Sequence, residues 1–337
     1  MRPAYWFPFL VCSALVVAGC DGGTAARTAT TRTTPSVPIS SSSVPGNSGP
    51  LHFARPVPVA PGAGLESVSC GSPTSCIALD RAGRAYVFNG TGWTGPEPAA
   101  AQPIGAGAIS VSCSNPAFCL AVATAGDQVI SWDGQAWSVP VTVEGANSLE
   151  AVGCAPTGYC AAVDAQGNAF AYSGGSWSGT SGDWGSVSAI SCVSSSFCVS
   201  ASGGISQWNG SQWTMPDSFS DSSSFAAVSC PTASFCTAVD ESGGSFVWNG
   251  LSWSGPVPIE PGRAAPTTIG VTVTGISCPS NSYCAATDDS GGVLQWSSHT
   301  WVRADIDGGH HLTSVSCPSI SLCVAVDQAG DAVVGRS

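Results

Sequence analysis

The sequence predicts an all-β protein, a seven-bladed β-propeller with four antiparallel strands in each blade. Fourteen of its 16 cysteines form seven pairs with the spacing C-x5-C. The first cysteines of successive pairs lie 43, 41, 38, 38, 48 and 39 residues apart, a period typical of propeller blades. Each repeat also contains four short β-prone segments separated by turn residues. The pairs are Cys70/Cys76, Cys113/Cys119, Cys154/Cys160, Cys192/Cys198, Cys230/Cys236, Cys278/Cys284 and Cys317/Cys323.

The fifth repeat illustrates the four predicted strands, which we call a, b, c and d in chain order. Strand a ends with Ala227–Cys230, strand b covers Cys236–Asp240, strand c covers Ser245–Trp248, and strand d begins at Trp253. The first two segments are rich in small and β-branched residues. An Asn-Gly pair between c and d is a strong signal for a tight hairpin. We therefore expect each repeat to form one antiparallel sheet.

The two ends of the chain are predicted to complete one blade together. The last repeat supplies strands a, b and c, ending at Asp331–Val334, and contains no strand d. The segment Phe53–Gly62 aligns without a gap with Trp253–Gly262, which is strand d of the fifth repeat and the turn after it. Pairing this segment with the C-terminal strands closes the ring and removes the open sheet edge. We expect residues 51–337 to form this propeller, as a monomer.

The N-terminal 50 residues have the composition of an export signal and a linker. Residues 1–19 contain Arg2 and then a mostly apolar run, which is typical of a secretory signal peptide rather than a membrane-spanning helix. The run ends in Val17-Ala18-Gly19-Cys20, which resembles the lipobox of bacterial lipoproteins. This resemblance implies cleavage before Cys20 and attachment of lipid to its thiol. Residues 20–50 are rich in Ser, Thr, Pro and Gly and are expected to form a disordered tether with a reach of roughly 30 Å.

The charge of the chain excludes one class of partner. The sequence contains no lysine, and 21 acidic residues stand against nine arginines. Proteins that bind the phosphate backbone of nucleic acids carry basic patches. A nucleic-acid partner is therefore not expected.

The repeated cysteines and aromatic residues have a structural interpretation. A C-x5-C pair places its two cysteines across the hairpin between strands a and b, and disulfides persist in exported proteins. We expect these bridges on the face that carries the a–b turns. Zinc binding and thiol redox chemistry, which use other spacings, are the alternatives. In six repeats an aromatic residue of strand c lies five residues before a Trp of strand d. Such pairs favour cross-strand packing, although stacking on sugar rings is a second interpretation.

Five repeats contain the motif D-x-x-G at the turn from strand b to strand c. Aspartate at the first position of a turn accepts hydrogen bonds from the following backbone, and glycine adopts the positive φ. The motif, followed by an aromatic residue, loosely resembles the repeats of Asp-box, tryptophan-docking and WD-type propellers. The resemblance implies that these residues stabilise the blade. The aspartates are Asp80, Asp164, Asp240, Asp288 and Asp327.

A binding site is expected on the face that carries the b–c turns and the connections from strand d to the next strand a. These connections vary in length, and variable loops on a rigid scaffold commonly bind ligands. The segment Asp305–His311 could bind a metal, but a solvated connection would look the same, since adjacent side chains of an extended loop point apart. No resident cofactor is predicted, apart from a Ca²⁺ ion that the acidic rim could hold. The candidate rim residues are Asp183, Asp217, Asp221, Glu260, Asp305, Asp307, His310 and His311.

The sequence favours a binding or scaffold protein over an enzyme without deciding between them. The lipobox, the lysine-free composition and the seven cysteine repeats resemble exported repeat proteins of actinobacteria, which implies a lipid-anchored protein on the outer face of the cytoplasmic membrane. An envelope protein or a glycan is the expected partner. The alternative is a glycan- or cell-wall-processing hydrolase or lyase. A sialidase would need an arginine cluster, whereas the arginines of this chain are scattered, and fold analogy alone carries no activity.

Overall fold

The computed structural model describes residues 50–97, 108–123, 126–180, 187–214, 219, 224–260, 272–297 and 299–337. All of them belong to one compact unit, Asn47–Ser337. Within these ranges the chain forms β-strands, turns and irregular segments but no helix, and so no helix that is long and apolar enough to cross a membrane. The predictions about the signal peptide, Cys20 and the tether fall outside the described residues.

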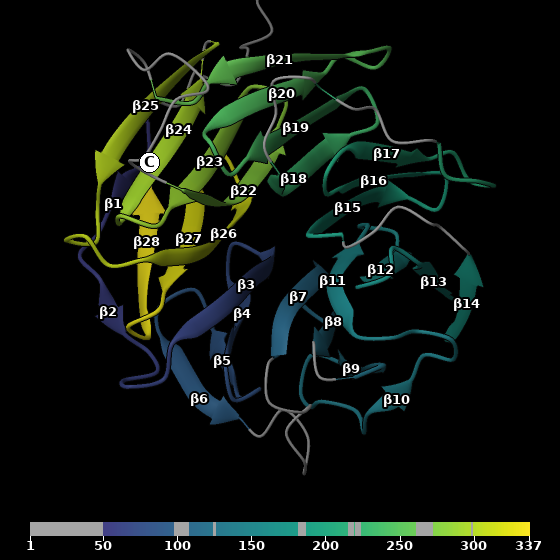
Figure 1. The fold of residues 1–337 in the computed structure, drawn as a ribbon. Helices are drawn as coiled ribbons and strands as arrows, with labels where there is room; N and C mark the ends of the chain where they lie inside the picture. Colours follow the sequence, from purple (N-terminus) through teal and green to yellow (C-terminus); the bar gives the residue numbers. More distant parts are fainter. Residues whose placement is uncertain are drawn as a thin grey trace, which may run out of the picture. The chain divides into compact units, whose positions relative to one another are not determined.

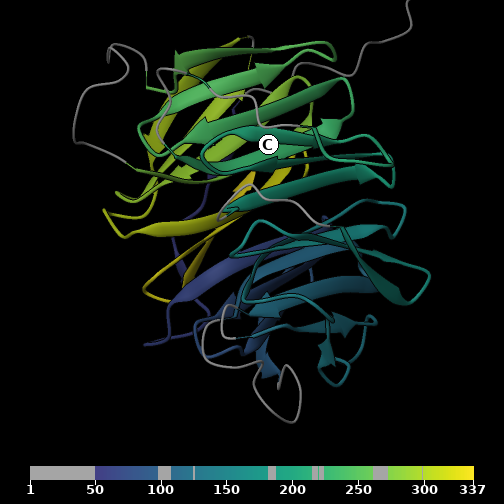
Figure 2. The same ribbon diagram turned by 45° about the vertical axis from the view of Figure 1, so that its right-hand side comes forward.

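The unit is a seven-bladed propeller, as the cysteine period predicts (Figure 1). Seven antiparallel sheets surround a central axis, and the view in Figure 2 shows the sheets stacked around it. The strand order in the sheets is a, b, c, d, and the a strands lie around the centre of the ring (Figure 1). The a strands are β3 (Leu65–Ser72), β7 (Ala108–Asn115), β11 (Leu149–Cys154), β15 (Ala189–Ser194), β18 (Phe225–Thr232), β22 (Val273–Ser280) and β26 (Leu312–Ser319).

The b and c strands are central in every sheet, and the d strands form the outer edge. The b strands are β4 (Ser75–Asp80), β8 (Phe118–Ala123), β12 (Cys160–Asp164), β16 (Phe197–Ala201), β19 (Phe235–Asp240), β23 (Tyr283–Asp288) and β27 (Leu322–Asp327). The c strands are β5 (Ala85–Phe88), β9 (Gln128–Trp132), β13 (Ala169–Ser173), β17 (Ile205–Trp208), β20 (Gly244–Trp248), β24 (Gly292–Ser297) and β28 (Asp331–Arg336). The d strands are β6 (Trp93–Glu97), β10 (Val141–Thr142), β14 (Ser176–Thr180), β21 (Trp253–Pro258) and β25 (Thr300–Asp305). The blades are numbered 1 to 7 in the chain order of their a strands. In blade 4 the described part of strand d is a single bridge between Trp208 and Trp213.

The N-terminal segment closes the ring in the predicted register. Strands β1 (His52–Phe53) and β2 (Val57–Pro58) both pair with β28. Phe53 lies opposite Gly335, just as Trp253 lies opposite Trp248 in blade 5. A Cβ atom added to Gly335 would lie 2.7 Å from the ring of Phe53. One aromatic ring over a glycine therefore replaces the aromatic pair of the other blades.

The hydrophobic core lies between neighbouring blades. Each of the seven interfaces holds one cluster of buried residues drawn from two adjacent sheets. The cluster between blades 7 and 1, for example, packs Leu65 and Tyr86 against Val324 and Val326. Burying one such aliphatic side chain stabilises the fold by about 1.5–3 kcal/mol. Because no blade can bury both of its faces alone, the ring is stable only when all blades are stacked.

All seven disulfides are local, as the C-x5-C spacing predicts, and join strands a and b within one blade. The bridged pairs are Cys70–Cys76, Cys113–Cys119, Cys154–Cys160, Cys192–Cys198, Cys230–Cys236, Cys278–Cys284 and Cys317–Cys323. Because these thiols are bridged, they offer no thiolate to a zinc ion or to redox chemistry. The two alternatives for the cysteines therefore do not apply to this structure.

The disulfides lie next to the a–b turns, as expected, but their second cysteines are buried between the blades and are not displayed on that face. The second cysteine of every pair is only 0–1% exposed, and each one is part of the hydrophobic cluster at a blade interface. The reason is that the second cysteine lies on strand b, which is covered by a neighbouring blade on its apolar face. These sulfur atoms are core groups and not surface sites. The buried cysteines are Cys76, Cys119, Cys160, Cys198, Cys236, Cys284 and Cys323.

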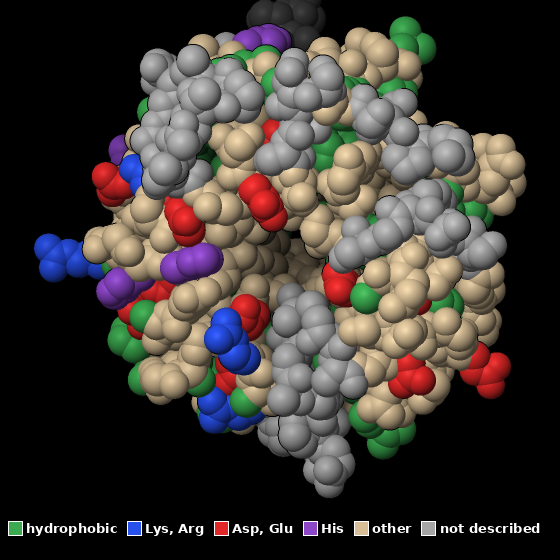
Figure 3. Space-filling view, in the orientation of Figure 1, with side chains coloured by type: hydrophobic (Ala, Val, Ile, Leu, Met, Phe, Trp, Pro, Cys, Tyr) green, Lys and Arg blue, Asp and Glu red, His purple; other side chains and the backbone are tan. Residues whose placement is uncertain are grey.

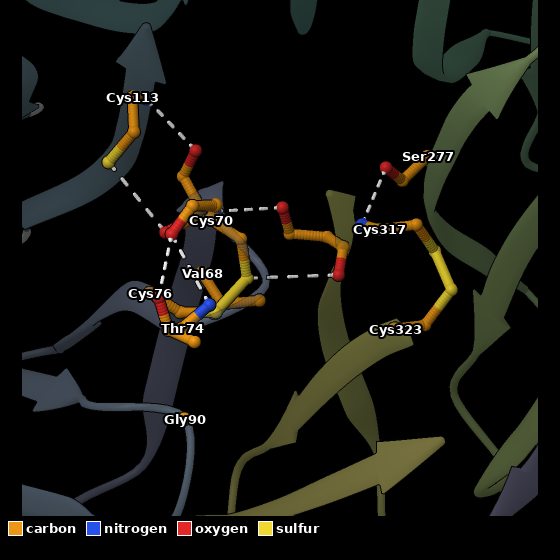
Figure 4. The surroundings of a disulfide bond; sticks show 12 residues. Val68, Cys70, Thr74, Cys76, Gly90, Cys113, Ser277, Cys317 and Cys323 are labelled. Atoms are coloured by element: carbon orange, nitrogen blue, oxygen red, sulfur yellow. Dashed lines mark hydrogen bonds between the residues drawn. A yellow bond between two sulfur atoms is a disulfide. The ribbon is translucent and has the colours of Figure 1, made fainter. Parts of the chain in front are cut away.

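A row of serines, for which the sequence suggested no role, links the blades next to these disulfides (Figure 4). The hydroxyl of Ser277 accepts a hydrogen bond from the backbone N–H of Cys317 in the next blade, at 2.9 Å. Six of the seven interfaces contain the equivalent bond, at 2.9–3.0 Å. At the remaining interface Gly153 takes the place of the serine.

Candidate functional site

The aspartates of the D-x-x-G turns are fully buried and organise the turn from strand b to strand c. Asp80, Asp164, Asp240, Asp288 and Asp327 each have 0% of their surface exposed. In four of these turns Oδ1 accepts hydrogen bonds from the backbone N–H groups two and four residues later. In the fifth turn Oδ1 of Asp327 accepts one from Asp331. The predicted structural role is therefore confirmed.

The second oxygen, Oδ2, accepts a hydrogen bond from a different side chain in each of blades 1, 3 and 6. In blade 1 it accepts from Nε of Arg84 at 2.6 Å, and in blade 3 from Nδ2 of Asn168 at 3.0 Å. In blade 6 Nε of Arg303 donates to Asp288 at 2.7 Å. Burial alone would raise the pKa of Asp288, but hydrogen bonds from Arg303, Gly292 and Ser290 outweigh it and lower the pKa. A cationic or amide donor thus offsets the buried charge in these three blades.

Blade 7 departs from this pattern, because an acid stands where a donor is needed. Asp331 lies four residues after Asp327, the position that Arg84 and Asn168 occupy in their own turns. Oδ2 of Asp327 has no hydrogen-bond partner among the described residues. Burial, and then the charge of Asp327, raise the pKa of Asp331. The turn of blade 7 therefore concentrates negative charge that no side chain of the turn itself offsets.

A second buried carboxylate reaches the same place from the connection between β25 and β26. Gly308 and Gly309 have φ values of 59° and 91°, which glycine adopts without steric cost. The resulting turn brings the N–H of His310 to within 3.1 Å of the carbonyl oxygen of Asp307. Asp307 is 2% exposed, and neither of its carboxylate oxygens has a hydrogen-bond partner among the described residues. The connection is therefore a tight turn and not the extended loop that the sequence suggested.

Asp307, Asp327 and His310 form one cluster, with one ligand atom from each lying within 4.8 Å of the others. Nδ1 of His310 lies 3.5 Å from Oδ2 of Asp327 and 3.8 Å from Oδ1 of Asp307. Burial, and then the adjacent Asp327, raise the pKa of Asp307 to about 7. The side chain of His310 is 57% exposed, so the cluster opens to solvent on its side. Two carboxylates and an imidazole are a donor set that divalent metals accept.

The structure separates the other rim residues from this cluster. Glu260 and Asp305 gather around Arg303: Nε of Arg303 lies 3.4 Å from Glu260, and its Nη1 pairs with Asp305. The backbone carbonyl of His311 accepts the N–H of Gln328, and His311 is not part of the cluster. Asp183, Asp217 and Asp221 lie outside the described residues. The described acidic rim is thus two groups, one of which already contains its own cation.

Acidic side chains also surround the centre of this face. Figure 3 looks down the axis and shows a hollow there, with acidic side chains near its edge. Histidine and acidic side chains lie together over the part of the ring where β25 leads into β26. Near the inner strands, Arg81 pairs with Glu66 at 2.6 Å. The described face therefore carries mainly negative charge, and its arginines are engaged with acids.

A separate groove of about 400 Å³ lies between blades 2 and 3. Strand β10 with Glu144 forms one side, and Phe170, Ser176 and Trp177 line the other. Of its described lining residues only Glu144 carries a carboxylate. Glycosidases of the common type use two carboxyl groups on either side of the scissile bond. This groove therefore lacks, among the described residues, the pair that the alternative of a glycan hydrolase requires.

Sequence reasoning missed Asp327 and Asp331 as members of a site, because Asp327 looked like its counterparts in the other turns. The signal lies in the residue that follows the turn glycine. It is Arg84, Asn168, Gly244 and Gly292 in the first four D-x-x-G turns. In blade 7 it is Asp331, the one acid at this position.

The fold and its acidic face define a seven-bladed β-propeller protein, and comparison with solved structures places it among propellers of varied function. No family model and no curated protein matches the sequence. A streptogramin B lyase structure is similar with a TM-score of 0.70 and 7% identity, covering 85% of this chain and 98% of that one. YCF48 bound to D1 peptide gives 0.67 and 14%, covering 86% and 98%. The WD40 repeats of RRP9 give 0.67 and 11%, covering 85% and 97%. At these identities the likeness shows the fold alone.

Proposed function

We propose that this chain is an exported, lipid-anchored binding protein that presents one face of a rigid propeller to a partner in the cell envelope. The difference between the two faces carries the proposal. The a–b and c–d turns on one face repeat almost unchanged, with a disulfide in every a–b hairpin. On the other face, the connections from strand d to strand a vary from six residues between β10 and β11 to 14 between β21 and β22. Variable connections on a rigid body are where recognition usually resides.

A protein or peptide is the favoured partner. Acidic side chains lie near the edge of the central hollow (Figure 3), which suits a partner with basic or amide groups. A propeller of similar fold, YCF48, has been solved bound to D1 peptide, so the architecture can hold a peptide. A glycan is the second partner class of this proposal.

An enzyme of the sialidase type is disfavoured by the pairing of the arginines. Arg81, Arg84 and Arg303 all form ion pairs with acids of the protein. A guanidinium that is already neutralised by a carboxylate grips a substrate carboxylate poorly. The described residues therefore support binding better than this chemistry.

Site-specific photocrosslinking on intact cells tests the proposed face. A photoreactive residue is placed at Glu241, which follows the turn aspartate of blade 5, and in a matched control at Leu251 in the c–d turn of the same blade. Both positions are exposed and lie at opposite ends of one sheet. We expect a discrete protein adduct from position 241 alone, identified by mass spectrometry. Equal capture at both positions, or capture at 251 alone, would contradict the proposal.

The lipid anchor is tested separately by replacing Cys20. The variant Cys20→Ala should lose acylation, as judged by the mass of the N-terminal peptide. The matched control Cys12→Ala alters a cysteine within the apolar run and should remain anchored. An N-terminal peptide without acyl mass in the wild-type protein would argue against lipidation at Cys20 without affecting the proposed binding face.

A further inference from the structure

We propose that Asp307, Asp327 and His310 bind a divalent transition-metal ion, such as Zn²⁺, which joins the blade 6–7 connection to the b–c turn of blade 7. This site goes beyond the proposed function and does not depend on the identity of any partner. Three features support it: the unmet bonding capacity of buried oxygens, the other blades as internal references, and the chemistry of the three donors.

The buried oxygens call for a positively charged partner. Both oxygens of Asp307 and Oδ2 of Asp327 have no hydrogen-bond partner among the described residues, although Asp307 is 2% exposed and Asp327 0%. Buried charges in folded proteins are paired or bind metals, because removal from water is otherwise too costly. Two carboxylates facing one another make this need stronger than a single buried acid would.

The other blades show how the same turn is neutralised when the protein supplies the donor. Arg84, Asn168 and Arg303 each donate to Oδ2 of their turn aspartate. In blade 5, Oδ2 of Asp240 also has no described partner, but Asp240 belongs to no group of three potential metal ligands in the described chain. Blade 7 alone among these turns combines an acid at the donor position with a second buried carboxylate. A cation from solvent would take the place of the Arg84 guanidinium.

The imidazole selects the class of metal. Ca²⁺ prefers oxygen ligands, whereas Zn²⁺ accepts both imidazole nitrogen and carboxylate oxygen. A tetrahedral ion with bonds of about 2.0–2.1 Å separates its ligand atoms by about 3.3–3.4 Å. The distances from Nδ1 of His310 to Asp327 and Asp307 are 3.5 and 3.8 Å, so small side-chain adjustments suffice. Three protein ligands leave the fourth position of a tetrahedral ion open.

The position of the site suggests what the metal does. The same turn that contains Asp327 also receives the N-terminal segment, because the carbonyl oxygen of Gly330 accepts the N–H groups of Val59 and Ala60. A metal bound here would hold together the connection from blade 6, the turn of blade 7 and, through that turn, the closing segment. We therefore expect the ion to stabilise the closure of the ring.

Metal binding to the full-length chain in detergent tests the proposal. After treatment with a chelator under non-reducing conditions, the protein is dialysed against Zn²⁺ and the bound metal is quantified. We expect one Zn²⁺ per chain and a higher thermal midpoint than in chelator. Asp307→Asn should weaken binding by more than about 100-fold, since even outer-shell changes cost tenfold or more. The matched control Asp305→Asn, two residues earlier and paired with Arg303, should bind within about twofold of wild type.

Two further variants make the result independent of folding defects. His310→Gln changes an exposed side chain and should weaken Zn²⁺ binding while leaving the fold intact. Asp331→Arg copies the arrangement of Arg84 in blade 1, and should raise the thermal midpoint in chelator and remove the response to Zn²⁺. The proposal is overturned if wild type binds no Zn²⁺, if Asp307→Asn and Asp305→Asn bind alike, or if Ca²⁺ binds more tightly than Zn²⁺. In the first case the two carboxylates share a proton instead.

Discussion

At the scale of single residues, one buried aspartate recurs in five blades with a nearly constant set of backbone bonds, whereas Oδ2 has a side-chain donor in blades 1, 3 and 6 and no described hydrogen-bond partner in blades 5 and 7. The backbone bonds explain why aspartate suits these turns, since its carboxylate accepts hydrogen bonds from the backbone N–H groups of the turn. The side chain beside Oδ2 determines how much free energy the buried charge of the aspartate costs. Arg303 offsets the charge of Asp288 in blade 6, whereas Asp331 adds charge beside Asp327 in blade 7.

The Asp288–Arg303 pair should make stability depend on acidity. The folded-state pKa of Asp288 is lowered, by hydrogen bonds that outweigh the opposing effect of burial. Its contribution is therefore present above the unfolded pKa of about 3.9 and is lost as the pH falls through the lower folded value. Asp288→Asn should cost about 2–3 kcal/mol at pH 7, and this difference from wild type should shrink below pH 4 in denaturant unfolding. A difference that stays constant from pH 7 to pH 3 would contradict this assignment.

At the scale of strands and blades, the serine that precedes the first cysteine fastens each inner strand to the next. Gly153 is the exception, and a Cβ atom added there would lie 2.8 Å from the carbonyl oxygen of Ile190. The inner strands of blades 3 and 4 approach too closely for a side chain. A glycine at this point is therefore a packing requirement and not a lost serine.

This difference gives opposite expectations for two substitutions at equivalent positions. Ser69→Ala removes one hydrogen bond between blades and should cost about 1 kcal/mol. Gly153→Ser restores the repeated residue yet should destabilise by about 1–3 kcal/mol, since it forces two backbones apart. Thermal unfolding of both variants, with the exposed Ser321→Ala as a neutral control, checks the pair. Stabilisation by Gly153→Ser would contradict the explanation that the inner strands of blades 3 and 4 lie too close together for a side chain at residue 153.

Features that recur in every repeat were predictable, and features that depend on contacts in space were not. The strands, the local disulfides and the N-terminal closure are predictable because seven copies of one pattern carry the same signals. The burial of the second cysteine, as at Cys76 and Cys323, was missed because the spacing defines the hairpin and not the blade that covers it. The serine bonds were missed because a small polar residue carries no distinctive signal without its neighbour in space.

The candidate metal site was beyond sequence reasoning for a related cause. The cluster of Asp307, Asp327 and His310 depends on a contact between a connection and a turn 20 residues apart in sequence. That contact requires the turn at Gly308 and Gly309, whereas the sequence pattern alone indicates an extended segment. The acidic residues of the connection were identified, but the partner in the turn of blade 7 was not.

At the scale of the whole molecule, stability depends on closure, because seven interfaces share one core arrangement and the last is completed by both chain ends. Strands β1 and β2 add only short ladders to β28, and the ring of Phe53 over Gly335 provides apolar contact there. The closing blade should therefore be the first to open locally.

Replacing Phe53 should expose this local opening. Phe53→Ala removes a half-buried ring and should cost about 2 kcal/mol, less than a fully buried phenylalanine. Amides of β28 should exchange with solvent deuterium faster in this variant, whereas those of β13 in blade 3 should be unchanged. Val57→Ala, at a residue that is 52% exposed, should alter neither. Faster exchange throughout all blades would mean that the ring unfolds as a single unit.

The closure also sets the repeating unit of the chain out of phase with the blade. Because the described chain begins on an outer strand and finishes on a third strand, one period of sequence runs d, a, b, c and crosses from one blade into the next. Deleting or duplicating such a period by recombination would leave both halves of blade 7 untouched. The number of blades can thus change one at a time over evolutionary time, while the strand pairing between the two chain ends in blade 7 is kept.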